Sequence, residues 1–413
     1  MERTLSIILL FLLPWTASGK TWHVSASGSL RSIHQALSLS LAGDSILVEP
    51  GVYREKGLVI EKPVHLIGRA LPVLDGEDRY EIISVRSNGV TVEGFRLIRC
   101  GRSGWNDIAA IKLYGVREVT IKGNYFERAF FGIFCQNARH CLISGNTLVS
   151  DAASEIQSGN GIHCWHCDSM RIEYNEVRGH RDGIYFEFVT HSLICGNRSI
   201  DNIRYGLHFM FSHEDIYSNN TFRHNAAGVS VMFSHGVSMT GNTFTENWGG
   251  GAYGLLMKEI TDSRVAGNHF LNNTSGIYME GTTRVKVLGN GFSGNGYAIK
   301  IQASCSDDTI TRNNFAGNTF DVATNGTLVL NNFDGNYWDK YEGYDLDRNG
   351  AGDVPYHPVS LFSMIAEKNP SVMMLFRSFM VSLLDRTEKV MPAITPENLK
   401  DDHPFMKPLT LQP

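Results

Sequence analysis

The 413-residue chain lacks a strong charge of either sign, and beyond its first residues it lacks long apolar runs. Its formal charge of −5 gives no basic field of the kind that attracts nucleic acid. No segment matches GxxxxGK[ST], the usual phosphate-binding loop of an ATPase. After residue 20, no stretch approaches the roughly 18–20 apolar residues that a membrane span requires. We therefore expect no nucleic-acid partner, no ATP hydrolysis by this chain and no membrane-spanning helix.

Cysteine is sparse and unevenly placed, with seven residues in the whole chain. An odd number with irregular spacing matches no dense disulfide framework. The one CxxC is Cys164-Trp165-His166-Cys167, whose thiols can close a small loop or hold a metal in an oxidising compartment. Buried single cysteines that pack as small apolar residues are the alternative. The pattern leaves these interpretations open.

The first residues have the features of an export signal. Arg3 is followed by the apolar run Leu5–Leu13 and then by Ala17-Ser18-Gly19, small residues of the kind found at cleavage sites. The nine residues of that run are too few to cross a bilayer. We therefore predict a signal peptide over residues 1–19 and a mature protein that works outside the cytoplasm.

A short apolar strand that ends in Gly-Asn or its equivalent recurs about every 22 residues between positions 120 and 320. IKGNYF at Ile121–Phe126 and MTGNTF at 239–244 are two examples. The asparagines of this repeat are Asn124, Asn146, Asn175, Asn197, Asn220, Asn242, Asn268 and Asn290. A period in the twenties indicates small units that stack on one another and bury a continuous core.

A second β-rich segment keeps the same spacing, from GIFC at 132–135 to AIKI at 298–301. Two strands per coil, with alternating apolar and polar residues and Gly or Asn at the corners, do not suit helical repeats. We predict an all-β fold, a right-handed parallel β-helix with about 22 residues per coil. About ten coils at ~4.8 Å each would make a rod of roughly 50 Å. Each corner Asn is expected to adopt a positive φ and to bond its side-chain amide to the next coil.

The β-helix is predicted to cover residues 20–335, and its first end to be capped. Residues 30–41 read as an amphipathic helix. Such a helix, within a cap at about 21–45, would cover strand edges that are otherwise open to end-to-end aggregation.

The C-terminal end is predicted to hold an Asp-, Gly- and Tyr-rich connecting loop at 336–360, then a Met-rich apolar helix and extended tail at 361–413. A helix over Val372–Leu384 would be about 20 Å long, too short to span a bilayer. A segment this apolar is expected to dock against the rod or a membrane partner. Prolines punctuate residues 391–413, which are expected to extend along a partner.

The connecting loop contains an acidic cluster. Asp345, Asp347, Asn349 and Asp353 resemble the start of a calcium loop, but Tyr356 stands where the bidentate Glu belongs. A calcium ion at 345–353 and a hydrogen-bonded turn are the two interpretations.

The period of two sorts the second repeat into inward and outward side chains. Cys135, Phe209, Met257 and their equivalents are predicted to point inward. The first outward column is Phe134, His163, Tyr185, His208, Ser230, Leu256, Tyr278 and Lys300. The second outward column is Gln136, Trp165, Glu187, Met210, Met232, Lys258, Glu280 and Gln302. One matching corner position is predicted for His140, His191, His213 and His235, with Asp168 in the coil between the first two.

Two coils carry the same tetrapeptide, Met-Phe-Ser-His, at 210–213 and 232–235. Stacking places Met on Met and His on His at roughly 5 Å. Thioether and imidazole are soft ligands that suit Cu(I) better than calcium or magnesium. The plain alternative is a core role for each Met and a solvated turn for each His, and their grouping favours the metal. The predicted copper-binding residues are His163, His208, Met210, His213, Met232 and His235.

A carbohydrate-active enzyme, such as a polysaccharide lyase or epimerase, is the rival function. That chemistry requires neighbouring carboxylates and a general base on one outer face. The columns offer Glu187 and Glu280, with three coils between them, about 19 Å. His180-Arg181-Asp182 is the nearest acid–base trio and is predicted to be a solvated turn. We assign no catalytic residue, and an adhesion rod without chemistry is a third possibility.

Several long motifs are distinctive in combination. They are SIHQALSLSLAGDSILVEPGVYRE with KPVHLIGR, the HFMFSH and VMFSH coils, GNYWDKYEGYDLDRNGAGDVPY, and the ending DDHPFMKP. With these motifs the chain resembles the NosD family, periplasmic β-helix proteins required for copper-centre assembly in nitrous-oxide reductase. The resemblance covers essentially the whole mature chain.

The resemblance implies a periplasmic protein without enzymatic activity, peripheral on the inner membrane through an ABC transporter. It implies that copper passes towards the apo reductase, for a CuZ- or CuA-type centre, from a copper chaperone lipoprotein. The segment at 361–391 would dock on the permease, and a separate ATPase subunit would hydrolyse ATP. The copper ligands named above are not carried over from the family, because they rest on the column argument.

Overall fold

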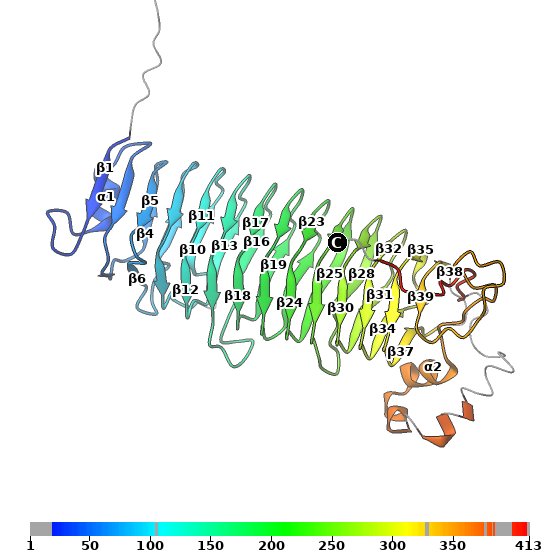
Figure 1. The fold of residues 1–413 in the computed structure, drawn as a ribbon. Helices are drawn as coiled ribbons and strands as arrows, with labels where there is room; N and C mark the ends of the chain where they lie inside the picture. The colour runs from blue at the N-terminus through cyan, green and yellow to red at the C-terminus, as the bar shows by residue number, and fades with distance from the viewer. Residues whose placement is uncertain are drawn as a thin grey trace, which may run out of the picture.

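The computed structural model describes residues 19–103, 106–326, 330–375, 378–381, 383–384 and 399–410. Three parallel sheets wind along one rod (Figure 1). The predicted all-β, right-handed parallel β-helix is confirmed. Its largest sheet has 14 strands, so the prediction of about ten coils was too low. The earliest coils lack the Gly-Asn signature from which the prediction was made. Except for Gly19, the predicted signal peptide lies outside the described residues.

The strands of the 14-stranded sheet are β1 (Thr21–Val24), β2 (Ser45–Val48), β5 (His65–Gly68), β8 (Thr91–Glu93), β11 (Thr120–Lys122), β14 (Leu142–Ser144), β17 (Arg171–Glu173), β20 (Leu193–Cys195), β23 (Ile216–Ser218), β26 (Ser238–Thr240), β29 (Arg264–Ala266), β32 (Lys286–Leu288), β35 (Ser306–Thr311) and β38 (Leu330–Asp334). Those of the 12-stranded sheet are β4 (Leu58–Ile60), β7 (Ile83–Val85), β10 (Ala109–Tyr114), β13 (Phe131–Gln136), β16 (Ile162–Trp165), β19 (Asp182–Glu187), β22 (Tyr205–Met210), β25 (Ala227–His235), β28 (Leu255–Thr261), β31 (Ser275–Glu280), β34 (Tyr297–Ile301) and β37 (Phe320–Ala323). Those of the 13-stranded sheet are β3 (Val52–Tyr53), β6 (Val73–Asp75), β9 (Arg96–Ile98), β12 (Tyr125–Glu127), β15 (Thr147–Val149), β18 (Glu176–Arg178), β21 (Arg198–Ile200), β24 (Thr221–Arg223), β27 (Thr243–Thr245), β30 (His269–Leu271), β33 (Gly291–Ser293), β36 (Asn314–Ala316) and β39 (Tyr337–Trp338).

The core runs the length of the rod, because equivalent inward side chains stack in successive coils. Six inward aromatic rings form one stack, with neighbouring centroids 4.1 to 5.5 Å apart: Phe222, Phe244, Phe270, Phe292, Phe315 and Trp338. Burying one such side chain contributes about 1.5–3 kcal/mol, so the stack is a large part of the local stability. The Gly that opens the second repeat is needed for close packing, since a Cβ at Gly206 would lie 2.6 Å from the Gly228 carbonyl oxygen.

Asparagine ladders connect the coils along the core. Asn146 Oδ1 accepts the Asn124 backbone N–H at 3.0 Å, and Asn146 Nδ2 donates to the Ile121 carbonyl at 2.9 Å. The predicted amide bonds are confirmed, but the predicted positive φ is wrong for these asparagines. It belongs to the preceding residue, for example Gly123 at 61° and Gly145 at 62°. A second ladder, which was not predicted, consists of Asn202, Asn225, Asn247, Asn273, Asn295 and Asn318.

The N-terminal end is closed by helix α1 (Ile33–Leu39), within the predicted range 30–41. Ser32 caps the helix by accepting the Gln35 backbone N–H, and Ile33 and Ala36 are buried in the core. Strand β1 pairs in parallel with β2, so part of the predicted cap is itself the first strand of the solenoid.

The C-terminal residues 399–410 return to the last coil of the rod. Buried Asp401 takes the place of the next ladder asparagine and accepts the backbone N–H groups of Gly335 and Asn336, each at 2.8 Å. It also accepts the indole N–H of Trp338 at 2.9 Å. The prediction that the whole tail extends along a partner is therefore wrong for 399–410, because these residues satisfy the open edge of the last coil. Residues 391–398 lie outside the described residues.

The apolar segment begins with helix α2 (Leu361–Lys368), which packs on β37, and continues as the 3-10 helix η1 (Pro370–Leu375). Among the described residues the predicted helix over Val372–Leu384 does not form as one element. Pro370 disfavours helical geometry at Asn369 and so separates the two short helices. None of the described helices is long and apolar enough to cross a membrane.

Candidate metal-binding face

The predicted copper-binding residues lie on the outer face of the 12-stranded sheet and at the corner that follows it. They are His163 on β16, His208 and Met210 on β22, Met232 and His235 on β25, and His213 after β22. The corner lies at Phe211 and Phe233, whose φ angles are 49° and 54°. The six residues therefore occupy three register positions: the first column, the second column and the corner.

The strands alternate inward and outward as predicted, but the first column is more buried than expected. Its outward side chains Phe134, His208, Ser230 and Leu256 are buried. Aromatic rings from the starts of the strands pack over them. The Tyr205 ring lies 4.7 Å from the ring of His208, and the Phe131 ring lies 5.4 Å from that of Phe134. The first column is therefore dry at these four positions and partly exposed at His163, Tyr185, Tyr278 and Lys300, whereas the second column is partly exposed at every position except Gln302.

His208, Met210 and Met232 form the most compact set of soft donors, here named the His–Met group. Met210 is the register partner of Met232, and His208 is that of Ser230. His208 and Met210 leave the same face of one strand about 7 Å apart, and Met232 stands one coil away, at ~4.8 Å. Three side chains at these spacings can converge on one ion.

Tyr185 connects the His–Met group with His163. Its ring centroid lies 4.7 Å from that of His163 and 4.9 Å from that of His208, and its hydroxyl lies 3.8 Å from Met210 Sδ. His163 and His208 are two coils apart, with Tyr185 as the register partner of both. His163 therefore belongs to a neighbouring position rather than to the same set of donors.

Both first-column imidazoles are held in the neutral form that binds metals. Burial lowers the pKa of His208 to about 4. Burial, with smaller effects of Arg181 and Lys112, lowers the pKa of His163 to about 3. Neither ring nitrogen of His208 has a hydrogen-bond partner among the described residues, and neither does His163 Nε2. Unpaired buried nitrogens are costly unless a ligand satisfies them.

The corner histidines form a separate stacked pair. The rings of His213 and His235 lie 4.1 Å apart with an interplanar angle of 11°. His213 Nδ1 accepts the His235 backbone N–H at 3.2 Å, and burial followed by the charge of His235 lowers the pKa of His213.

The corner prediction was wrong for two histidines. In successive coils, the position of His213 is occupied by Thr190, then Asp168, then Arg139. His191 follows Thr190, and His140 follows Arg139, so each of these histidines lies one residue after the corner position. At that later position His191 contacts two carboxylates, Asp168 at 2.9 Å and Glu214 at 2.8 Å. The hydrogen bond to Asp168 is the main cause of the raised pKa of His191.

The acid–base trio at 180–182 is not the solvated turn that was predicted. His180 and Asp182 are fully buried. Asp182 forms two hydrogen bonds with the Arg204 guanidinium, at 2.9 and 2.6 Å. An aspartate held in this way is structural, because its negative charge is already paired in the protein interior. Asp182 Oδ2 lies 4.0 Å from His208 Nδ1, too far for a hydrogen bond.

The carboxylates of the second column do not form a pair. Glu280 is paired with Lys258 at 3.0 Å. Glu187 is the register partner of Met210, and the Tyr185 hydroxyl lies 3.5 Å from it. On the described part of this face, no second carboxylate stands beside Glu187 for the two-carboxylate chemistry of glycoside cleavage.

The acidic loop at 345–353 is satisfied by its own backbone. Asp345 accepts the N–H groups of Asn349 and Gly350, and Asp353 accepts that of Leu346. This geometry is that of the hydrogen-bonded turn. Within the described ranges, no group of three or more His, Cys, Asp or Glu side chains is arranged to hold a metal ion. The His–Met group is of a different kind, because two of its three donors are thioethers.

Sequence reasoning missed the neighbours of this face. The rings of Tyr185 and Tyr205 pack against His208 and keep it dry; Tyr185 stands in the GIYF repeat, and Tyr205 directly precedes GLHF. The tyrosine before Gly206 was a usable signal, since a residue that precedes the repeat glycine leans over the first column.

Solved structures with this fold have varied activities. The A-module of a mannuronan C-5 epimerase from Azotobacter vinelandii matches with a TM-score of 0.55 and 13% identity, over 76% of this chain and 98% of that chain. A surface adhesin of Streptococcus pneumoniae matches with a TM-score of 0.57 and 10% identity, over 70% of this chain and 86% of that chain. A DFA-IIIase from Arthrobacter chlorophenolicus matches with a TM-score of 0.53 and 14% identity, over 74% of this chain and 85% of that chain. At these identities the likeness shows the fold alone.

Comparison of sequences is more specific. The family described as "Periplasmic copper-binding protein (NosD)" matches residues 149–343. A protein from Pseudomonas aeruginosa named "Probable ABC transporter binding protein NosD" is 30% identical over 374 residues, 86% of each chain. A protein of the same name from Stutzerimonas stutzeri is 29% identical over 370 residues, 84% of each chain. The chain belongs to the NosD family.

Proposed function

We propose that this chain is a periplasmic accessory protein without enzymatic activity that binds Cu(I) in transit and passes it towards apo nitrous-oxide reductase. In this proposal it acts with an ABC transporter, whose separate subunit hydrolyses ATP, and receives copper from a chaperone lipoprotein. The description of the family as periplasmic and copper-binding, and the transporter in the names of its relatives, support the proposal. Copper is the cargo here and not a resident cofactor.

The observation that carries the proposal is the His–Met group. It combines two half-exposed thioethers with an imidazole that burial keeps neutral and whose nitrogens have no partner among the described residues. Thioether sulfur and neutral imidazole nitrogen favour Cu(I) over hard cations. Without strong thiolate donors such a site can release its ion, which suits transfer better than storage. His163, His213 and His235 extend it to neighbouring positions along the face.

A docking role is proposed for the apolar segment after residue 361. Lys300, at the end of the first column, forms an ion pair with Glu367 of α2 at 2.6 Å, which fixes the helix at the end of the metal-binding face. Beyond α2, Met374 is 90% exposed and Phe379 83% exposed, with Met380 and Leu383 also exposed. We propose that these side chains contact the periplasmic side of the transporter permease. Membrane association would then come from the permease and place the copper face close to the transporter.

Anaerobic titration of the purified mature chain with Cu(I), against a competing chelator, tests copper binding. The test variant is Met210→Leu with Met232→Leu, which removes both thioethers and keeps apolar volume. The matched control is Met257→Leu with Met279→Leu, because these two residues are also register partners in adjacent coils but are fully buried.

We expect the Met210/Met232 variant to lose affinity by more than about 10- to 100-fold, the usual cost of removing even an outer partner of a metal site. The control variant should bind like the wild type. Equal affinity in all three proteins would place copper elsewhere and reject the proposed ligands.

Co-purification with the permease and its ATPase subunit tests the docking segment. Phe379→Ser with Met380→Ser is expected to abolish co-purification and to leave the stability of the rod unchanged. Ile156→Ser is the control, since Ile156 is an apolar side chain with 88% exposure on a loop of the solenoid. Undiminished co-purification of the double variant would contradict this docking surface.

A further inference from the structure

Three of the seven cysteines form a buried chain of contacts that the copper proposal does not use. Cys135 on β13 and Cys164 on β16 are register partners, and Cys167 follows in the same coil as Cys164. The Cys164 thiol shifts the pKa of both Cys135 and Cys167, so the three thiols are close neighbours. All three thiols are free and buried. Cys164 therefore has two possible partners for a disulfide.

The corner brings the two cysteines of the CxxC together. In a straight strand, residues three apart point to opposite faces, about 10 Å from one another. His166 adopts a φ of 50°, which turns the chain between Cys164 and Cys167 so that both side chains enter the core. Cys167 Sγ lies 3.4 Å from the carbonyl oxygen of Cys135 and 3.4 Å from that of Trp165.

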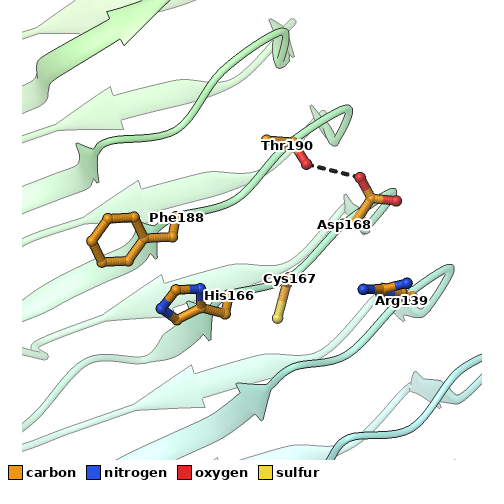
Figure 2. Close-up of a pocket in the computed structure, with 6 residues that line it drawn as sticks. All are labelled: Arg139, His166, Cys167, Asp168, Phe188 and Thr190. Carbon is orange, nitrogen blue, oxygen red and sulfur yellow. Dashed lines mark hydrogen bonds between the residues drawn. The ribbon is translucent and has the colours of Figure 1, made fainter.

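A cavity of about 340 Å³ reaches the outermost thiol of this chain. It is lined by Arg139, His166, Cys167, Asp168, Phe188 and Thr190. Figure 2 shows Cys167 between the two rings of His166 and Phe188 on one side and Arg139 with Asp168 on the other. Asp168 is already engaged by Thr190 at 2.8 Å and His191 at 2.9 Å. Arg139 lines the same cavity as the Cys167 thiol.

The electrostatics single out Cys167 as the reactive sulfur. The hydrogen bond from the Cys164 thiol is the main cause of the lowered pKa of Cys167, and burial opposes it. A Cys-X-X-Cys pair in which one thiol has a lowered pKa and lines a cavity is typical of reactive dithiols. The four other cysteines lack a lowered pKa: burial raises the pKa values of Cys100, Cys141 and Cys305, and Cys195 is half-buried and lies outside the CxxC.

We propose that Cys164 and Cys167 are a redox-active dithiol that reduces small disulfides reaching it through the Arg139–Thr190 cavity. The Cys167 thiolate attacks one sulfur of the external disulfide, forms a mixed disulfide and releases one thiolate. Cys164 Sγ then attacks Cys167 Sγ, forms the internal disulfide and releases the second thiolate. The external disulfide gains two electrons and, with one proton from the Cys164 thiol and one from solvent, leaves as two thiols. This proposal is independent of copper.

The test uses the full mature chain, reduced and freed of metal, with hydroxyethyl disulfide as the probe. After the reaction, remaining thiols are alkylated under denaturing conditions and located by peptide mass spectrometry. We expect the wild type to lose two of its seven thiols, Cys164 and Cys167, to one internal disulfide. Cys305→Ser, a buried cysteine in another coil, should lose the same two.

Cys164→Ser provides the second arm, because it removes the resolving thiol. The mixed disulfide should then accumulate on Cys167, although Cys195 is more exposed. Far-UV circular dichroism checks the fold of this variant, and the wild-type map stands by itself if the variant is unfolded. A Cys135–Cys164 disulfide, first modification at Cys195, or seven unreacted thiols in the folded wild type would each overturn the proposal.

Discussion

Two pairs of methionines stand on the same sheet and differ only in which way they point. Met210 and Met232 are register partners in adjacent coils, and so are Met257 and Met279. The second pair is fully buried among core side chains, whereas the first is half-exposed beside His208. The comparison teaches that side-chain direction, which alternates inward and outward along a strand, decides whether a thioether packs in the core or is available to an ion. Residue type alone does not separate the two roles.

The largest expected effect is on stability, and it falls on the inward pair. Met257→Ala should destabilise the rod by about 2–5 kcal/mol, because it leaves a cavity in a core that stacks through every coil. Met210→Ala should cost less than about 1 kcal/mol, because its side chain already meets solvent. Denaturant unfolding measures both as shifts of the midpoint at unchanged slope. Equal losses would show that the outward pair is also part of the core.

The second effect is acid sensitivity, which separates a buried histidine from an exposed one. The pKa of His208 is about 4 in the folded chain against 6.5 when unperturbed. The unfolded chain therefore takes up a proton first, and stability is lost as pH falls from about 6.5 towards 4. The loss is on the order of 3 kcal/mol. In His208→Gln the share of this loss that comes from His208 should be absent, while the shares of His163 and His180, whose pKa values burial also lowers, remain. Unfolding at pH 7, 6, 5 and 4 measures the difference from the wild type.

His191→Gln is the control for the acid series. The raised pKa of His191 gives the opposite sign: its contribution is present at low pH and disappears as pH rises through the folded pKa. This variant should therefore show an acid loss at least as large as that of the wild type. If His208→Gln is as acid-sensitive as the wild type, the imidazole is not the dry, neutral group described here.

The smallest expected effect concerns the corner pair. His235→Gln should lower Cu(I) affinity by less than about tenfold, or 1.4 kcal/mol. The reason is that Phe233 turns the chain between Met232 and His235, so the imidazole approaches the His–Met group only from beyond the corner. Competition titration measures it beside the methionine variants. Complete loss of binding in His235→Gln, with binding kept in the Met210/Met232 variant, would move the site to the corner.

Local periodicity was enough to predict the parallel β-helix, the ladder bonds and the inward or outward phase of the second repeat. It gave two β-rich segments per coil where the structure has three sheets, because the Gly-Asn corner divides the first segment into two strands, such as β11 and β12. Asn124 and Asn146 show its limit, since the Gly-Asn pair identified the corner but not that Gly carries the positive φ. We predicted one corner position for four histidines, although the number of residues after the last inward side chain separates them. His140 follows inward Cys135 by five residues, and His213 follows inward Phe209 by four.

Contacts between distant parts of the chain were beyond the sequence. Asp401 closes the ladder at Asn336 from 65 residues away, and it lies in no repeat from which this role could be predicted. The burial of His208 depends on Tyr205, and that of Asp182 on Arg204 one coil later. Such contacts arise from the stacking of coils, so the candidate residues could be named in advance but not their dryness, spacing or neighbours.

The measurement that tests the central claim most directly is Cu K-edge X-ray absorption of the Cu(I)-loaded chain. It is to be recorded for the wild type, the Met210→Leu/Met232→Leu variant and the Met257→Leu/Met279→Leu variant. The account predicts sulfur and imidazole scatterers in the wild type and the inward variant, and loss of the sulfur shell in the outward variant. A sulfur shell that persists unchanged when Met210 and Met232 are leucine would contradict it.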